Sequence, residues 1–121
     1  MLRAELEGIY PLDYGSWEEF AQAEHAESWD NFGWFRLDVG VEGELGSTDF
    51  QALITTPLAK SRAKDENPGW RILVVQSFEP EALMAELRSY IGSVTGATYT
   101  EIVEQLRRNA YWEYEALNTR S

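Results

Sequence analysis

Few residues in this 121-residue chain have the types and spacing that catalysis requires. Its single histidine is His25, and it contains no cysteine. A zinc site built on His25 lacks a second histidine or a cysteine ligand, and a nucleophilic serine or threonine could take its base only from His25 or a lysine. We therefore interpret His25 as an exposed side chain, and we expect no catalytic residue, no metal site and no cofactor.

One pair of carboxylates stands beside an aromatic residue. Asp38, Glu42 and Trp34 share one side of an alternating stretch. Four residues along a strand separate two carboxyl groups by about 13 Å, which exceeds the roughly 5–9.5 Å of glycosidase carboxyl pairs. The trio fits an acidic binding surface with an aromatic anchor better than a hydrolytic site. The alternative is that the N-terminal segment simply covers Trp34.

The charge of the chain is concentrated in its first part. The net charge is -11, and residues 1–49 contain twelve acids and two bases, whereas residues 50–121 contain nine acids and eight bases. An acidic surface repels nucleic acid and anionic membranes and attracts basic proteins. The alternative is that it serves only solubility. No apolar run reaches the roughly 18 residues of a membrane span, so we expect a cytoplasmic protein.

Alternating and apolar stretches predict four strands. We expect strands over Leu2–Tyr10, Trp34–Glu42 and Asp49–Thr56, with a glycine-containing hairpin connection at 43–47. Residues Trp70–Phe78 are apolar on both sides, which predicts a strand in the middle of the sheet, and we expect a loop over residues 60–69 before it.

Capping signals and periodicity predict the helices. Ser16 and Glu19 indicate a short helix, and we expect residues 11–31 to pack on the sheet. Pro80 opens a helix that Gly96 can end, and Thr98 with Glu101 opens a last helix carrying a Glu104–Arg108 pair. Tail residues 111–117 fit either a helix or a strand, and we expect the rings of Tyr111, Trp112 and Tyr114 to pack inside the protein.

These elements predict one domain over residues 1–121. The expected fold class is α+β, with an antiparallel sheet of about four strands and two C-terminal helices packed on one face.

Several segments follow one another in an order typical of a known family. They are a strand ending in Thr-Pro (49–57), the strand 72–75 with the turn 78–81, two helices of which the second begins near 99–102, and the closing run Tyr111-Trp112-Glu113-Tyr114. In this order, over roughly residues 33–117, the chain resembles the immunity protein 8 family of bacterial polymorphic toxin systems. Two features depart from that family: Leu58-Ala59 follows the Thr-Pro, where the family often has Trp-Leu, and residues 11–31 match no part of it.

The resemblance implies a small cytoplasmic protein without enzymatic activity that neutralises a polymorphic or contact-dependent toxin encoded beside it. Many such toxins are nucleases, whose clefts are basic because they bind phosphate. We expect the toxin contact to include Glu18, Glu19, Trp34, Asp38, Glu42, Glu44 and Asp49. The alternative function is a small-ligand or carbohydrate-binding module that uses Trp34 and Trp70.

Overall fold

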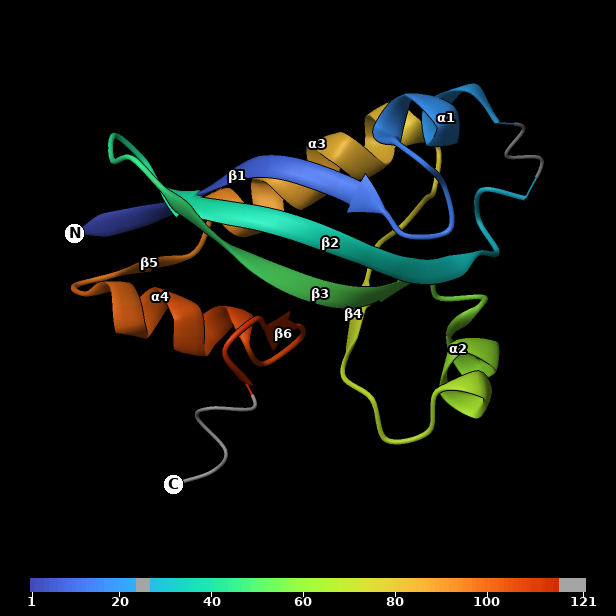
Figure 1. Cartoon of the computed structure of the whole chain (residues 1–121). Coiled ribbons are helices and arrows are strands. Elements are labelled where there is room, and N and C mark those ends of the chain that lie inside the picture. The colour runs from blue at the N-terminus through green and yellow to red at the C-terminus, as the bar shows by residue number, and fades with distance from the viewer. Residues whose placement is uncertain (24–26, 116–121) are drawn as a thin grey trace.

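The computed structural model describes residues 1–23 and 27–115, so His25 and residues 116–117 of the tail lie outside the described residues. The fold is α+β, as predicted, with helices packed on a curled sheet (Figure 1). In chain order the elements are β1 (Leu2–Pro11), α1 (Trp17–Gln22), β2 (Phe32–Val41), β3 (Ser47–Thr55), α2 (Lys60–Glu66), β4 (Ile72–Val74), α3 (Pro80–Gly92), β5 (Thr95–Gly96), α4 (Tyr99–Leu106) and β6 (Tyr111–Trp112).

Three long strands form the body of the sheet. The order is β4-β3-β2-β1-β5, and the short β6 also pairs with β3. The neighbours β1 and β2, and β2 and β3, are antiparallel, whereas β4 runs parallel to β3. The sheet is therefore mixed, because the chain crosses through α2 before it returns alongside β3.

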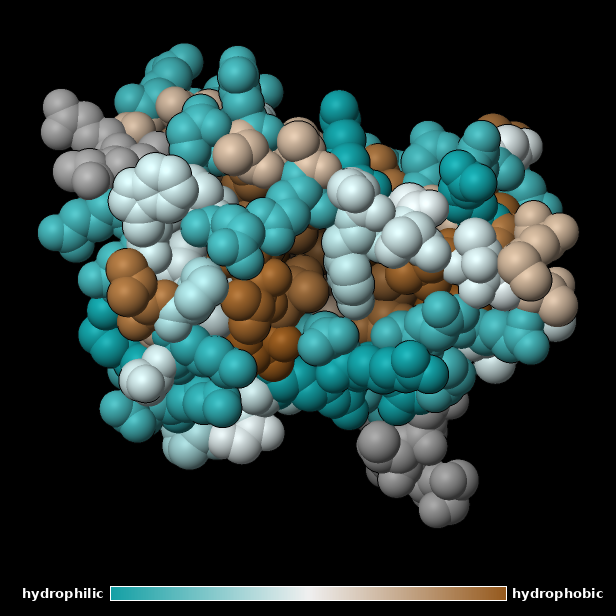
Figure 2. Space-filling view, turned by 180° about the vertical axis from the view of Figure 1, so that it is seen from behind, coloured by the Kyte–Doolittle hydropathy of each residue, from teal (hydrophilic) through white to brown (hydrophobic). Residues whose placement is uncertain are grey.

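The main core lies on one face of this sheet. Alternation along β2 turns Phe35, Leu37 and Val39 inward, and α3 and α4 cover them with one apolar side each, including Leu87 and Ile102. Figure 2 views the molecule from the side opposite to Figure 1, and brown apolar atoms reach the surface there between polar side chains. Among the described residues, no helix is long and apolar enough to cross a membrane.

A β-bulge changes which residues of β1 face the core. Leu6 pairs with Val39 but Gly8 pairs with Asp38, so Glu7 is an extra residue in β1. Strict alternation would place Gly8 on the inner side with Ala4 and Leu6. The bulge shifts the phase, and Ile9 is the buried residue instead.

The strand predicted over Trp70–Phe78 is not in the middle of the sheet. Its regular part is β4, which pairs only with β3 and forms one end of the strand order. Leu73 and Val75 are buried, but Val74 is 38% exposed and Trp70 is 50% exposed. The prediction was wrong because an apolar side chain on each face does not require that both faces be covered.

The segment between β1 and β2 packs on the sheet, as predicted for its described residues. The Ser16 hydroxyl accepts a hydrogen bond from the Glu19 amide, as expected for the N-cap of α1. The Glu19 carboxylate accepts from the Gly15 amide, one residue before the position of a standard capping box. Phe20 is 2% exposed and contacts Phe35 edge to face, with ring centroids 5.9 Å apart.

A helix occupies most of the region predicted to be a loop. Residues Lys60–Glu66 form α2, which contacts β2 and β3. Its N-cap, Ala59, provides no side-chain hydrogen bond, so the sequence lacks the usual signal for a helix start. Ala59 and Ala63 are fully buried, and their burial stabilises this helix on the sheet.

The C-terminal helices begin where predicted but end differently. Glu79 caps α3, and Thr98 forms a full capping box with Glu101 in α4. However, α3 ends at Gly92, and Gly96 belongs to β5 instead of the helix end. The predicted Glu104–Arg108 pair is also wrong, since Glu104 pairs with Arg107. The undecided tail forms a strand at Tyr111–Trp112.

Candidate partner-binding surface

The second face of the sheet, opposite the main core, gathers polar and aromatic side chains from four strands. We call it the outer sheet face. Pairing places Tyr10 beside Arg36, Asp38 beside Asp49, and Gln51 beside Tyr111. With Trp34 at one end, the outer sheet face consists of Tyr10, Trp34, Arg36, Asp38, Asp49, Gln51 and Tyr111.

Arg36 lies at the centre of the outer sheet face. Its guanidinium carbon is 4.1 Å from the centroid of the Tyr10 ring. Its Nε atom is 3.4 Å from Asp38 Oδ1 and 3.9 Å from Asp49 Oδ2. Arg36 Nε and Asp38 Oδ1 are buried atoms without an aligned hydrogen bond in the described structure, although their distance allows an ion pair. Arg36 is therefore the shared counter-ion of two carboxylates, and both distances are longer than that of a good charged hydrogen bond.

The two carboxylates stand directly opposite each other on neighbouring strands. The hydrogen bond with Asp38, partial burial and the Asp38 charge together raise the pKa of Asp49 from its ordinary 3.8 to about 6, against the opposing effect of Arg36. At neutral pH Asp49 is ionised opposite the carboxyl group of Asp38, and like charges placed opposite each other weaken a sheet. The pair therefore destabilises the isolated protein.

A cluster of three aromatic rings flanks this polar centre. The ring centroid of Trp34 lies 5.4 Å from that of Trp70, and the Tyr111 centroid lies 5.2 Å from that of Trp70. Trp34 Nε1 donates a hydrogen bond to Asn67 at 3.3 Å. Trp34 is therefore half-buried, with the segment after α2 and Tyr111 of β6 in contact with its ring.

A hollow of about 350 Å³ opens beside the polar centre. Its lining residues are Arg36, Asp49, Gln51, Tyr111, Trp112, Glu113 and Glu115. Glu115 binds both Arg71 and Arg107. Burial alone would raise the pKa of Glu115, but hydrogen bonds from Arg107 and Arg71 outweigh burial and lower it. Within the described residues, no three His, Cys, Asp or Glu side chains are grouped to hold a metal ion.

The structure groups only some of the seven residues predicted to contact a partner. Trp34, Asp38 and Asp49 share the outer sheet face. Glu42 and Glu44 lie beyond the end of β2, at the exposed β2–β3 hairpin, where Gly43 and Gly46 take positive φ values of 83° and 93°. Glu18 and Glu19 lie on α1, which packs on the core side of the sheet. The predicted acids therefore lie at three places: the outer sheet face, the hairpin and α1.

Four residues of the outer sheet face, Tyr10, Arg36, Gln51 and Tyr111, were not among the predicted contacts. Arg36 has the same parity as Trp34 and Asp38, so alternation along β2 could have identified it. Tyr10 was harder to place, because it follows the bulge in β1. Tyr111 reaches this face through a pairing with Gln51 that spans 60 residues of sequence, and no local pattern reveals such a contact.

We expect Asp49→Asn to stabilise the isolated protein at neutral pH. A rise in pKa from 3.8 to about 6 corresponds to roughly 3 kcal/mol. Because the Asp49 side chain is 40% exposed, solvent screening reduces the expected gain to about 1 kcal/mol. A raised pKa contributes stability that is complete below pH 3.8 and lost as the pH rises through about 6. The advantage of the variant should therefore be present at pH 7.5 and nearly absent at pH 4.

Urea unfolding at these two pH values measures this effect. Asp65→Asn is the control, because it neutralises an exposed carboxylate of α2. An equal effect of Asp49→Asn at both pH values would show that Asp38 does not control the protonation of Asp49.

Comparison with known proteins identifies the class to which this fold and surface belong. The family model of immunity protein 8 matches residues 8–117, which is most of the chain. The chain therefore belongs to the immunity protein 8 family. No curated protein and no solved structure matches it.

Proposed function

We propose that this chain binds the toxin domain of a protein encoded beside it and neutralises that domain in the cytoplasm. Membership of an immunity protein family supports a toxin as the partner. The net charge of -11 supports a basic toxin domain, such as a nuclease whose cleft binds phosphate. The chain covers the toxin's active site or a surface next to it.

The Asp38–Asp49 pair is the observation that carries this proposal. The two acids repel each other in the isolated protein and share only Arg36. A lysine or arginine from a basic partner would relieve that repulsion at the moment of binding. Groups that cost stability when the protein is alone are typical of binding surfaces.

The β2–β3 hairpin extends the acidic surface away from the sheet. Glu42 and Glu44 are exposed, and Leu45 between the two hairpin glycines is fully exposed. Acids at such a position attract a basic partner over a distance, whereas an apolar side chain contributes area once contact is made. Trp34 provides a half-buried aromatic contact on the outer sheet face.

The alternative function, a carbohydrate-binding module, depended on Trp34 and Trp70. The two indole rings contact each other edge to face at 88°. This contact occupies part of the surface on which a sugar ring would stack. The family membership and the acidic pair also favour the immunity function over this alternative.

We expect the double variant Glu42→Lys and Glu44→Lys to slow association with the toxin domain by about tenfold at low salt, because charges at the rim of an interface act mainly on the association rate. The fold should tolerate both changes, since the Glu42 ion pair with Arg3 is more than 60% exposed on both sides. Surface plasmon resonance with an inactivated toxin domain measures the rate.

The matched control is Asp65→Lys with Glu66→Lys on α2, which changes the net charge by the same amount at another surface. Equal slowing by both double variants would mean that only net charge matters. Association unchanged by the hairpin variant would remove the hairpin from the proposed contact.

A further inference from the structure

The β1 strand has an open edge along most of its length. On the side away from β2, β5 pairs only with Leu2 and Arg3, and the Ala4 amide donates to the carbonyl of Val94. From Leu6 to Pro11, none of the described residues forms a strand beside this edge. Successive amides of a strand point to opposite sides, so the Leu6 amide points away from β2, as that of Ala4 does. Unpaired groups of this kind can hydrogen-bond another chain.

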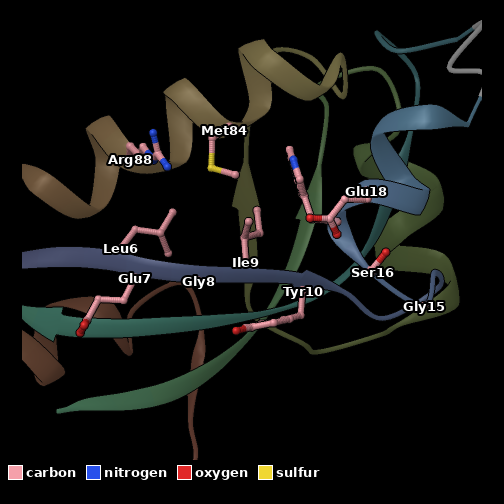
Figure 3. A pocket seen from close by; sticks show the side chains of 11 residues that line it. Leu6, Glu7, Gly8, Ile9, Tyr10, Gly15, Ser16, Glu18, Met84 and Arg88 are labelled. Atoms are coloured by element: carbon pink, nitrogen blue, oxygen red, sulfur yellow. The ribbon is translucent and has the colours of Figure 1, made fainter.

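An apolar hollow runs beside the open edge. It measures about 360 Å³ and lies between β1, the start of α1 and α3. Figure 3 shows Leu6 and Ile9 pointing from β1 toward Met84 and Arg88 of α3, whereas Glu7 and Tyr10 point to the other side of the strand. A second hollow of about 410 Å³ adjoins it, since Trp17, Met84 and Arg88 line both.

These features define what could bind at the edge. A segment paired with β1 must be extended, and its side chains must alternate between the two sides of the sheet. One set would enter the apolar hollow over Leu6 and Ile9. The other set would lie beside the acids Glu5 and Glu7, which favour lysine or arginine.

A second copy of this chain is a poor occupant of the same edge. Pairing two β1 strands would bring Glu5 and Glu7 of one copy close to the same acids of the other, in a protein of net charge -11. The bulge at Glu7 also divides the edge into two short stretches, which discourages a long continuous partner strand. A short basic segment avoids both obstacles, because its charge is opposite to that of Glu5 and Glu7 and it needs only one of the two stretches.

We propose that a short extended segment of the toxin domain, with alternating apolar and basic residues, adds to the sheet at the open edge of β1. This inference rests on the proposed function and adds a second contact, on the edge next to α1 and α3. Glu18 lines the same hollow, so this contact also accounts for an acidic residue that lies away from the outer sheet face.

Amide hydrogen exchange tests the strand pairing directly. The probe is an inactivated variant of the toxin domain encoded beside this chain. The bulge at Glu7 shifts the alternation, so the Ile9 amide also points away from β2. In the complex, exchange of the Leu6 and Ile9 amides should slow by at least about tenfold, because each amide gains a hydrogen bond and loses contact with water. A tight complex in which both amides exchange as fast as in the free protein overturns the inference and leaves the proposed function intact. Absence of any complex overturns the proposed function and the inference with it.

One pair of variants separates the backbone contact from side-chain loss. Leu6→Pro and Leu6→Ala both remove the leucine side chain, but only proline also removes the amide that faces the open edge. The dissociation constant should rise about tenfold more for proline than for alanine. Circular dichroism checks that each variant folds.

Met84→Lys keeps the inference testable even if Leu6→Pro fails to fold. It places a positive charge in the hollow, where it should weaken toxin binding by at least about tenfold. Ala82→Lys is the control, an exposed position on the same helix and outside the residues that line either hollow. Equal affinities for Met84→Lys and Ala82→Lys would overturn the contact at the hollow.

Discussion

Replacing Phe20 with alanine is expected to lower the free energy of unfolding by about 3–5 kcal/mol. Phe20 is 2% exposed and is the buried residue of α1. Its ring centroid lies 5.1–6.4 Å from those of Trp17, Phe35 and Phe78, so its loss leaves a cavity between α1, β2 and the start of α3. Urea unfolding followed by tryptophan fluorescence measures the change.

The matched control for this prediction is Trp29→Ala, since Trp29 is 66% exposed. We expect the control to cost less than about 0.5 kcal/mol, as is usual for surface substitutions. Similar losses for Phe20→Ala and Trp29→Ala would mean that α1 is not part of the cooperative core.

Replacing Glu115 with glutamine is expected to cost about 2 kcal/mol. Glu115 is only 16% exposed and accepts hydrogen bonds from Arg71 and Arg107. Removing its charge leaves Arg71 without its counter-ion and leaves Arg107 with only the more exposed Glu104. Breaking a fully buried pair in this way costs roughly 3–5 kcal/mol. The cost here is smaller because the Arg71 side chain is 34% exposed and solvent screens its charge.

Glu104→Gln is the control, because Glu104 pairs with the same Arg107 but is 59% exposed. It should cost less than about 0.5 kcal/mol. Because the pKa of Glu115 is lowered in the folded protein, its contribution is present above its ordinary value of 4.5 and is lost as the pH falls through the folded pKa. The difference in free energy of unfolding between Glu115→Gln and Glu104→Gln should therefore shrink in strong acid. A difference that persists there would show that the charge of Glu115 is not the cause.

Local signals in the sequence predicted the elements that local chemistry determines. Alternation identified β1, β2 and β3, and the glycines at 43 and 46 identified the hairpin between the last two. The capping residues Ser16 and Thr98 identified the starts of α1 and α4, and Pro80 identified the start of α3. Each of these signals acts within about one turn or one hairpin.

Elements that depend on distant residues could not be predicted in this way. The two-residue strands β5 and β6 exist because β1 and β3 pair with them. The helix α2 has no capping side chain and is held by burial of Ala63. The position of β4 at the sheet edge follows from its parallel pairing with β3, which the apolar pattern of a single strand does not contain.

The candidate surface was predictable only in part. The shared parity of Trp34 and Asp38 placed both residues on one face, and the structure adds Asp49 directly opposite Asp38. The position of Glu18 beside the open edge of β1 required the packing of α1 on the sheet. Charge alone had grouped these acids without distinguishing the outer sheet face, the hairpin and α1.

Above all, we propose that this chain binds a toxin domain and inhibits its activity. The most direct measurement titrates the toxin domain encoded beside this chain with the purified protein and follows the toxin's activity. At concentrations far above the dissociation constant, activity should fall in proportion to the added chain until the two are equimolar, and then remain near zero. Full toxin activity in the presence of a large molar excess of folded chain would contradict the claim.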